Sequence, residues 1–205
     1  MAALQIWVRS LETKEEIRKY ALKLRAGIKK PQRAAAERVI TERLMKEPLY
    51  ENARCIYCYA SFRDEVDTTD IIRETLIRGK KVAVPRVAGR RTMEFYFIKS
   101  MADLSPGIWD IPEPGTWCEK APQPDEETLV ILPGAAFDCS GARIGYGGGF
   151  YDTYLEGNDK CRKAALAFDI QCMDRIPVDE HDIRTEIIIT EKERIICSQD
   201  YPKTR

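Results

Sequence analysis

The 205-residue sequence predicts an α/β fold, with one domain in which a mostly parallel sheet carries helices on both faces. Short apolar runs recur along the chain at residues 55–60, 81–87, 94–98, 128–132, 163–168 and 186–190. Helical patterns lie between several of these runs. The runs are continuously apolar instead of alternating with polar residues, which is typical of strands covered on both faces. We therefore expect a three-layer arrangement spanning residues 1–205.

Two helices are predicted before the first strand. Thr13 and Glu16 have the spacing of a capping box, which marks a helix start. Apolar residues then recur at helical spacing: Ile17, Ala21, Leu24 and Ile28. A second helix is expected to begin near Pro31 and to end before Pro48. Its apolar stripe consists of Val39, Ile40 and Leu44.

The next segments predict a βαβ unit over residues 55–87, with a helix at 69–78 that Gly79 ends. A further strand is expected at 94–98. Residues 105–124 contain five prolines, too many for a helix or a central strand, so we expect an ordered loop carrying Trp109 and Trp117. A final helix is expected near Phe150.

The composition limits the partners. The chain has 33 basic and 33 acidic residues, and a neutral balance argues against a dedicated nucleic-acid binder. No apolar run approaches the roughly 20 residues of a membrane span, and the N-terminal sequence lacks a signal-peptide pattern. Seven scattered cysteines do not suggest a disulfide framework. We expect a cytoplasmic monomer with no nucleic-acid or membrane partner.

Positive charge is concentrated near the N-terminus. From Arg9 to Arg33 there are nine basic and three acidic residues, one of the latter being Glu12. This pattern is compatible with a solvated helix face or with an anion-binding site.

A glycine-rich run follows the strand at 128–132. Its glycines are Gly141, Gly145, Gly147, Gly148 and Gly149, and Arg143 and Asp152 flank the densest part. Glycines after a strand let the backbone approach a ligand closely, and ligands of parallel sheets bind at the carboxyl ends of strands. The run lacks the Gly-Lys-Ser/Thr ending of a P-loop, and Phe150 replaces the third glycine of a dinucleotide fingerprint. It therefore predicts either an anion-binding turn or a flexible glycine loop.

Three other features are weaker candidates for functional residues: a cysteine pair, the single histidine and a tryptophan. Cys55-x-x-Cys58 lies within a predicted strand, so its members should face opposite sides as buried structural cysteines. His181 is the single histidine and could serve as a general base. Trp109 could pack its own loop or form a wall for an aromatic ligand.

The string RIGYGGGFYDTYL at 143–155 resembles the signature of the 5-formyltetrahydrofolate cyclo-ligase (5,10-methenyltetrahydrofolate synthetase) family. Lys14-x-x-x-Arg18 is similar to the family's N-terminal basic helix. Glu65-Val66-Asp67-Thr68 resembles its segment after the first strand. Pro177-Val178-x-x-His181-Asp182 resembles its C-terminal element. The resemblance runs from about residue 13 to residue 191. It implies a Rossmann-like fold related to those of sugar-phosphate isomerases and CoA transferases.

The resemblance also implies a reaction. ATP, with Mg²⁺, would phosphorylate the formyl oxygen of 5-formyltetrahydrofolate. N10 would then attack the formyl carbon and phosphate would leave, giving 5,10-methenyltetrahydrofolate. An amide-like oxygen is a poor leaving group until it is phosphorylated, and phosphoryl transfer depends mostly on positioning and electrostatics.

By motif match, the resemblance implies these ATP-binding residues: Lys14, Arg18, Arg143, Ile144, Gly145, Tyr146, Gly147, Gly148, Gly149, Phe150 and Tyr151. The substrate-binding residues would be Ala60, Glu65, Tyr146, Gly147, Gly148, Gly149 and Phe150. Trp109 is a further substrate-binding candidate, as a wall for the pterin, and does not come from the motif match. Arg143 and Tyr151 would be catalytic, and Asp152 and Asp182 would bind Mg²⁺. Some family members carry a larger residue at the position of Ala60, or a lysine at that of Gly148.

Two other functions stay open at this point. One is a non-catalytic regulator that binds folate or nucleotide on the same scaffold, since a fold does not fix a function. The other is a sugar-phosphate isomerase or CoA transferase, but no segment matches the glutamate nucleophile that a transferase needs.

Overall fold

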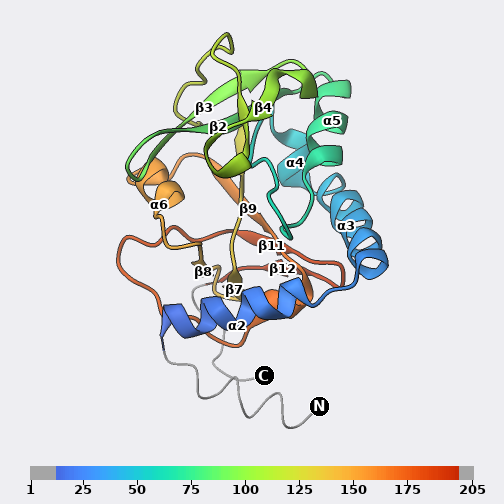
Figure 1. Cartoon of the computed structure of the whole chain (residues 1–205), viewed down its shortest axis with the longest axis vertical. Coiled ribbons are helices and arrows are strands. Elements are labelled where there is room, and N and C mark those ends of the chain that lie inside the picture. The colour runs from blue at the N-terminus through green and yellow to red at the C-terminus, as the bar shows by residue number, and fades with distance from the viewer. Residues whose placement is uncertain (1–12, 199–205) are drawn as a thin grey trace.

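A seven-stranded sheet forms the centre of the molecule, as seen in the computed structural model, which describes residues 13–198 (Figure 1). In sheet order the strands are β12 (Arg194–Ile196), β11 (Ile187–Ile189), β9 (Arg162–Leu166), β6 (Thr128–Leu132), β1 (Cys55–Cys58), β2 (Lys81–Gly89) and β3 (Thr92–Ile98). The strands from β11 to β2 are parallel, whereas β12 and β3 are antiparallel edge strands. The predicted α/β fold with a mostly parallel sheet is therefore confirmed.

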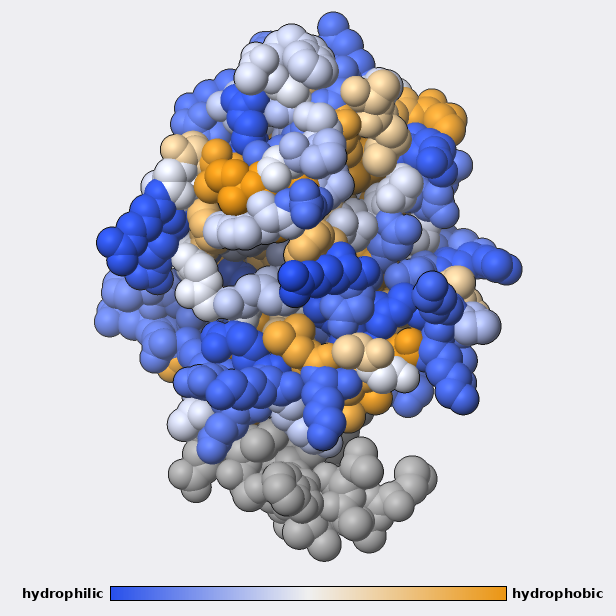
Figure 2. All heavy atoms as spheres, in the orientation of Figure 1, coloured by the Kyte–Doolittle hydropathy of each residue, from blue (hydrophilic) through white to orange (hydrophobic). Residues whose placement is uncertain are grey.

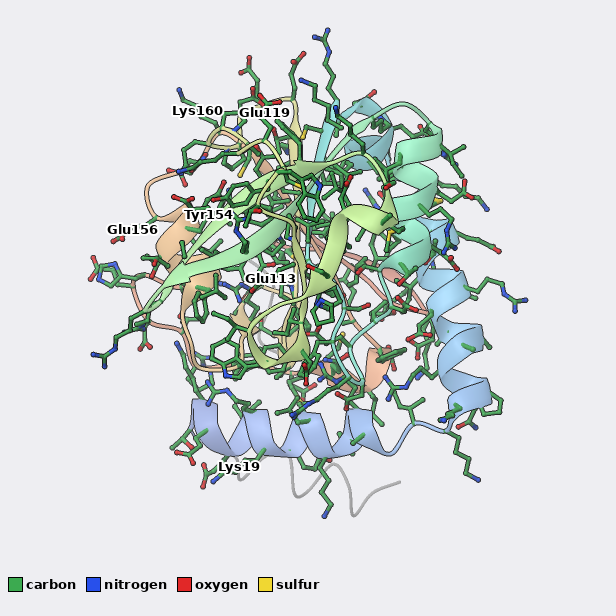
Figure 3. The ribbon with its side chains drawn as sticks, turned by 45° about the horizontal axis from the view of Figure 1, so that its top comes forward. Lys19, Glu113, Glu119, Tyr154, Glu156 and Lys160 are labelled. Carbon is green, nitrogen blue, oxygen red and sulfur yellow. The ribbon has the colours of Figure 1, made fainter. Side chains whose placement is uncertain are left out.

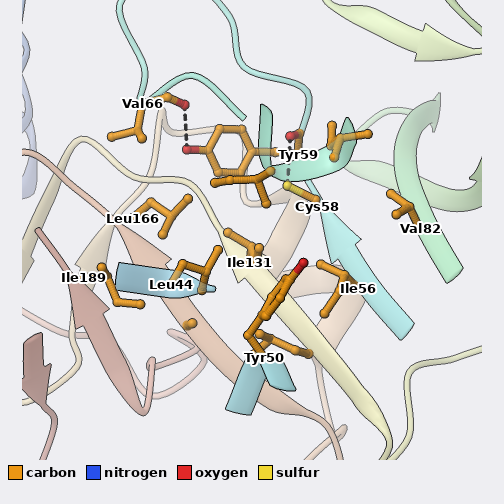
Figure 4. Close-up of a cluster of buried hydrophobic side chains, with 14 of the residues drawn as sticks. Leu44, Tyr50, Ile56, Cys58, Tyr59, Val66, Val82, Ile131, Leu166 and Ile189 are labelled. Carbon is orange, nitrogen blue, oxygen red and sulfur yellow. Dashed lines mark hydrogen bonds between the residues drawn. The ribbon is translucent and has the colours of Figure 1, made fainter. Parts of the chain in front are cut away.

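Helices cover one face of this sheet more fully than the other. Helices α3 (Lys30–Leu44), α4 (Pro48–Asn52) and α5 (Thr69–Ile77) lie together on one side (Figure 1). The apolar cluster beneath them includes Leu44, Tyr50 and Ile131 (Figure 4). The opposite face is covered by the short helix α6 (Phe150–Leu155) and by a small sheet of β7 (Ala136–Asp138), β8 (Arg143–Ile144) and β10 (Cys172–Met173).

Strand β1 shows how the sheet serves both layers. Ile56 and Cys58 contribute to the cluster under α3 to α5, while Cys55 and Tyr57 contribute to the cluster under α6. Alternation of this kind follows from the two-residue period of a strand. Both cysteines have free thiols, and burial raises the pKa of Cys55 to about 12. The predicted structural role of this pair agrees with these findings.

Helix α2 (Lys14–Ala26) packs against the small sheet and not against the central one. Its buried residues Ile17 and Ala21 contact a cluster that includes Ala136 and Ile144. The Thr13 capping box is present at its start. Because β8 leads directly into the glycine run, this packing holds one face of α2 beside that run (Figure 1).

Most predicted elements are observed, with some differences. The first helix ends at Ala26 and so does not reach Ile28. Val39, predicted in the apolar stripe of α3, is 38% exposed, because the helix turns only Ile40 and Leu44 into the core. The proline-rich segment is more regular than a loop: β4 (Leu104–Pro106) pairs with β5 (Pro112–Pro114), joined by a short 3₁₀ turn at Ile108–Asp110.

The small sheet was not predicted from the sequence. Its strands have two or three residues each, too few to show a period. Of the basic stretch, Arg9 and Glu12 lie outside the described residues. The domain boundaries 1–205 stay a prediction.

Candidate functional site

A cavity of about 1080 Å³ opens at the carboxyl ends of β1 and β6, where Ala60 and Pro133 follow the two strands. All of the ATP-binding, substrate-binding, catalytic and metal-binding residues predicted from the sequence line this cavity, whereas the weaker candidate His181 does not. They reach it from α2, from the β1–α5 loop, from the proline-rich ribbon formed by β4 and β5, from the segment between β8 and α6, and from the loop between β10 and β11 that carries Asp182. The surrounding surface is mostly hydrophilic and is interrupted by apolar groups, some of them just above α2 (Figure 2). The site thus lies where ligands of parallel sheets usually bind.

Helix α2 brings cations to the cavity. Lys14 pairs with Asp179 at 2.7 Å and also with Asp182. Burial lowers the pKa of the Lys14 ammonium, but the two aspartates outweigh this effect and leave the pKa raised. Arg18, one turn later, donates its Nε–H to the carbonyl of Gly145 at 2.7 Å. Lys14 and Arg18 are four residues apart, so their side chains project from the same face of α2.

Arg25 lies further along the same face and is buried in the cavity wall. Its guanidinium donates to the Tyr146 hydroxyl at 2.7 Å and to Asp64 at 2.8 Å. Burial lowers the pKa of Arg25, but its hydrogen bonds to Asp64 and Tyr146 raise it overall. The Nε of Arg25 has no hydrogen-bond partner. Tyr146 is 48% exposed, so its ring is open to the cavity while its hydroxyl is held in place.

The loop after β1 presents Glu65 to the cavity. The hydroxyl of Tyr59 donates to the carbonyl of Val66 at 3.1 Å (Figure 4). Thr68 donates its hydroxyl to the carbonyl of Tyr59 at 2.7 Å. Glu65 accepts the backbone N–H of Phe62 at 2.8 Å. Burial raises the pKa of Glu65, and a hydrogen bond with Tyr146 and the one from Phe62 offset only part of that rise.

The glycine run needs glycine at specific positions. Gly147 and Gly149 have φ values of 96° and 67°, which residues with a side chain rarely adopt. A Cβ on Gly149 would lie 2.8 Å from a nitrogen of Arg91. The run therefore has a defined path between α2 and the β2–β3 hairpin, which argues against a merely flexible loop.

Arg143 and Tyr151 lie next to each other in the cavity wall. Arg143 is buried and donates to Asp152 at 2.7 Å. Its guanidinium lies over the Tyr151 ring, 5.7 Å from the ring centre. Burial raises the pKa of Tyr151 well above its usual value. The Nε of Arg143 and the hydroxyl of Tyr151 both lack hydrogen-bond partners, an uncommon state for buried polar atoms.

Asp152 and Asp182 come together from distant parts of the chain. Besides Arg143, Asp152 accepts the backbone N–H of Ile183, the residue after Asp182, at 3.2 Å. Asp152 does not cap α6, because the N-cap position is Gly149 and no side chain caps it. Two carboxylates fit Mg²⁺, which typically takes one or two carboxylates and completes its shell with phosphate oxygens and water. Within residues 13–198, no group of three or more ligating side chains has the geometry of a metal site.

Of the remaining sequence-predicted candidates, two line the cavity and one does not. Trp109 lines the cavity and is 63% exposed, which favours a ligand-facing wall over loop packing. Ala60 lines the cavity at the end of β1. His181 is exposed and does not line the cavity, which does not support a general base at this position.

Some lining residues were missed. Arg25 follows Lys14 by eleven residues, about three helical turns, so helical periodicity alone could have found it. Arg63 and Arg91 lie on loops and have no pattern in the sequence. Glu113 of β5 also lines the cavity and accepts the backbone N–H of Val87 at 3.2 Å, which ties the proline-rich ribbon to β2 (Figure 3).

Comparison with known proteins agrees with the site. The chain matches the 5-formyltetrahydrofolate cyclo-ligase family over residues 10–191. It is 34% identical to the 5-formyltetrahydrofolate cyclo-ligase of Mus musculus, over 82% of this chain and 92% of the mouse protein. The chain belongs to this family.

A solved structure supports the same relationship. The 5,10-methenyltetrahydrofolate synthetase of Aquifex aeolicus superposes with a TM-score of 0.77 at 28% identity, covering 94% of this chain and 95% of the other. The synthetase of Mycoplasma pneumoniae shares the fold, with a TM-score of 0.70 at 18% identity over 88% of this chain and 99% of the other. The cyclo-ligase family is a family of ligases. No helix in the described part of this chain has the length and apolarity to span a membrane.

Proposed function

We propose that this cyclo-ligase family member converts 5-formyltetrahydrofolate to 5,10-methenyltetrahydrofolate, using ATP and Mg²⁺ and releasing ADP and phosphate. The observation that carries the proposal is that one cavity at the carboxyl edge of the sheet is lined by every site residue that the family resemblance implies. Family membership supports the choice of substrate class. We expect the protein to act as a monomer in the cytoplasm.

The reaction requires activation of the formyl oxygen. The γ-phosphoryl group of ATP transfers to that oxygen, N10 attacks the formyl carbon, and the carbon–oxygen bond breaks as phosphate leaves. N10 loses its proton to water. Catalysis of phosphoryl transfer is mostly positioning and charge stabilisation. Lys14, Arg18 and Arg143, with the Gly145–Gly149 backbone, are the groups that would hold the phosphates.

The folate would bind at the other lining residues. The pterin edge carries hydrogen-bond donors that suit the carboxylate of Glu65, which the Phe62 N–H and Tyr146 keep in place. The exposed ring of Trp109 and those of Tyr146 and Phe150 offer flat apolar surfaces for the pterin. Ala60 leaves room at the end of β1.

Mg²⁺, when bound, would neutralise charge on the transferring phosphate oxygens. Asp152 and Asp182 are the residues that would hold it. Each is paired with a cation in this structure, Asp152 with Arg143 and Asp182 with Lys14. We infer that ligand binding exchanges these ion pairs, so that the two cations turn to the phosphates and the two carboxylates to the metal.

The test is the growth of a near-ultraviolet absorbance band when the protein meets 5-formyltetrahydrofolate, ATP and Mg²⁺. Ring closure creates an extended conjugated amidinium, so the band reports product directly. We expect the band only when all three are present, with one ADP formed per product. Binding of both ligands without the band would instead favour a non-catalytic regulator.

A further inference from the structure

The cavity mouth has unusual backbone conformations. Four described residues other than glycine have positive φ: Arg63, Arg91, Trp109 and Asp110, at 57° to 61°. Arg63, Arg91 and Trp109 line the cavity. Such conformations cost energy in a residue with a side chain and tend to occur at ligand sites. Arg63 and Arg91 are therefore candidate ligand-binding cations that neither the family signature nor the sequence pattern identifies.

Arg91 reaches the glycine run from a distant element. It lies in the turn of the β2–β3 hairpin, just after the irregular pairing between Val87 and Gly89. Its Nε donates to the carbonyl of Gly148 at 3.2 Å. A Cβ on Gly149 would lie 2.8 Å from the Arg91 guanidinium, so the absence of a side chain at 149 permits this approach.

The charge of Arg91 is uncompensated. In the cavity, Lys14, Arg25 and Arg143 each form an ion pair with an aspartate. Among residues 13–198, no ion pair involves Arg18 or Arg91, and each instead donates to a carbonyl of the glycine run. Arg18 binds the Gly145 carbonyl and Arg91 the Gly148 carbonyl, so two unneutralised guanidinium groups bracket the run. A guanidinium with donors to spare suits the bidentate binding of phosphate or carboxylate.

We propose that Arg91 binds an oxyanionic group of the ligand at the glycine run, opposite Arg18. The inference rests on the proposed function, which supplies two ligands with oxyanions. These are the phosphates of ATP and the carboxylates of the folate's glutamate tail. When the ligand binds, the Arg91 guanidinium gives up its hydrogen bond to the Gly148 carbonyl and binds the oxyanion instead. The turn of the β2–β3 hairpin holds Arg91 in position for this contact.

The experiment compares two neighbouring arginines. Arg91→Asn removes the guanidinium, and asparagine tolerates the positive φ of this position. Arg90→Asn is the matched control, because Arg90 adjoins Arg91 on the same turn, carries the same charge and does not line the cavity. Calorimetry would measure binding of a non-hydrolysable ATP analogue with Mg²⁺, of inorganic tripolyphosphate, and of 5-formyltetrahydrofolate with one or three glutamates. Thermal midpoints would confirm that both variants are folded.

We expect Arg91→Asn to weaken binding about tenfold in one of these arms, the loss of one charge-assisted contact, and Arg90→Asn to change it less than about twofold. A loss with the ATP analogue and tripolyphosphate identifies the oxyanion as phosphate, and a loss confined to one or both of the folates identifies it as carboxylate. Equal losses in the two variants, or no loss in any arm, would overturn the role of Arg91 and leave the proposed function intact. A wild-type protein that binds none of the probes would overturn both.

Discussion

The two ends of the central sheet hold cavities of different chemistry. The candidate site lies at the carboxyl end, and a second cavity of about 700 Å³ lies at the amino ends of β6, β9 and β11. Both are lined by several basic residues. At the amino end, Arg162 pairs with Glu186 and Arg194 pairs with Glu47, and cations of the carboxyl-end cavity are likewise paired with aspartates. Basic residues around a cavity are therefore not enough to indicate a ligand site.

The carboxyl-end cavity differs in having buried polar side-chain atoms without hydrogen-bond partners. Within residues 13–198, three buried side-chain atoms lack a hydrogen-bond partner: Arg25 Nε, Arg143 Nε and Tyr151 Oη. All three residues line the carboxyl-end cavity and none lines the other. Arg63, Arg91 and Trp109, which have positive φ, and the glycines from Gly145 to Gly149 also line the carboxyl-end cavity and not the other. Buried polar atoms without partners, positive-φ residues and a glycine-rich backbone distinguish the carboxyl-end cavity. A bound ligand can supply the missing hydrogen bonds, and strained conformations tend to occur at ligand sites.

The largest effect is expected for Glu65→Gln, which should weaken folate binding and leave ATP binding nearly unchanged. Loss of one charged hydrogen bond costs about 1.5–3 kcal/mol. Calorimetry with each ligand measures this, with Glu186→Gln at the amino end as the matched control. Unchanged folate affinity in Glu65→Gln would remove the residue from the site and weaken the contrast between the two cavities.

Asp152→Asn and Asp182→Asn should each lower turnover about tenfold, which is about 1.4 kcal/mol of transition-state stabilisation. Each should also raise the Mg²⁺ concentration needed for half-maximal rate. Because the Ile183 N–H joins the two segments, the double variant should be worse by less than the product of the single effects. Normal Mg²⁺ titrations in both single variants would rule out the metal assignment.

Tyr151→Phe should lower turnover about fivefold, an effect of about 1 kcal/mol. Its hydroxyl has no partner in the unliganded protein, so the thermal midpoint of the free protein should stay the same or rise. Tyr154→Phe is the control on the same helix, since Tyr154 does not line the cavity (Figure 3). Equal turnover in the two variants would assign Tyr151 to packing alone.

Lys14→Ala and Arg18→Ala should each raise the KM for ATP about threefold, while the stability of the free protein changes by less than about 0.5 kcal/mol. Lys19→Ala is the control, because Lys19 points away from the body of the molecule and pairs with Glu15 (Figure 3). A large loss of stability with normal ATP saturation would return both residues to a structural role.

The smallest effect concerns pH. Burial raises the pKa of Glu65 above its usual 4.5, so the folded protein favours the protonated carboxyl. That stabilisation is complete below pH 4.5 and is lost as the pH rises through the folded-state pKa. Thermal unfolding of wild type and Glu65→Gln across this range should show the variant gaining relative stability as the pH rises. A relative loss instead would mean that the folded protein stabilises the charged carboxylate.

The sequence allowed most of the sheet and the site to be predicted. Strands that lie in continuous apolar runs have a readable pattern, whereas the edge strand β12 and the small sheet of β7, β8 and β10 do not and were not predicted. The site residues with a motif were also found. Arg25 was missed even though it shares the helical face of Lys14 and Arg18, and Arg91 was missed because a hairpin turn carries no periodic signal.

The sequence by itself determined the strand order of the βαβ unit, the glycine positions and the residues that carry the family signature, because propensity, period and spacing are local properties. Only the tertiary structure decided which charges are neutralised. Lys14 meets Asp182, Arg143 meets Asp152 and Arg91 meets the carbonyl of Gly148 through contacts between segments far apart in the chain. Electrostatic energy depends on distance and burial in space, and neither can be read from the order of residues.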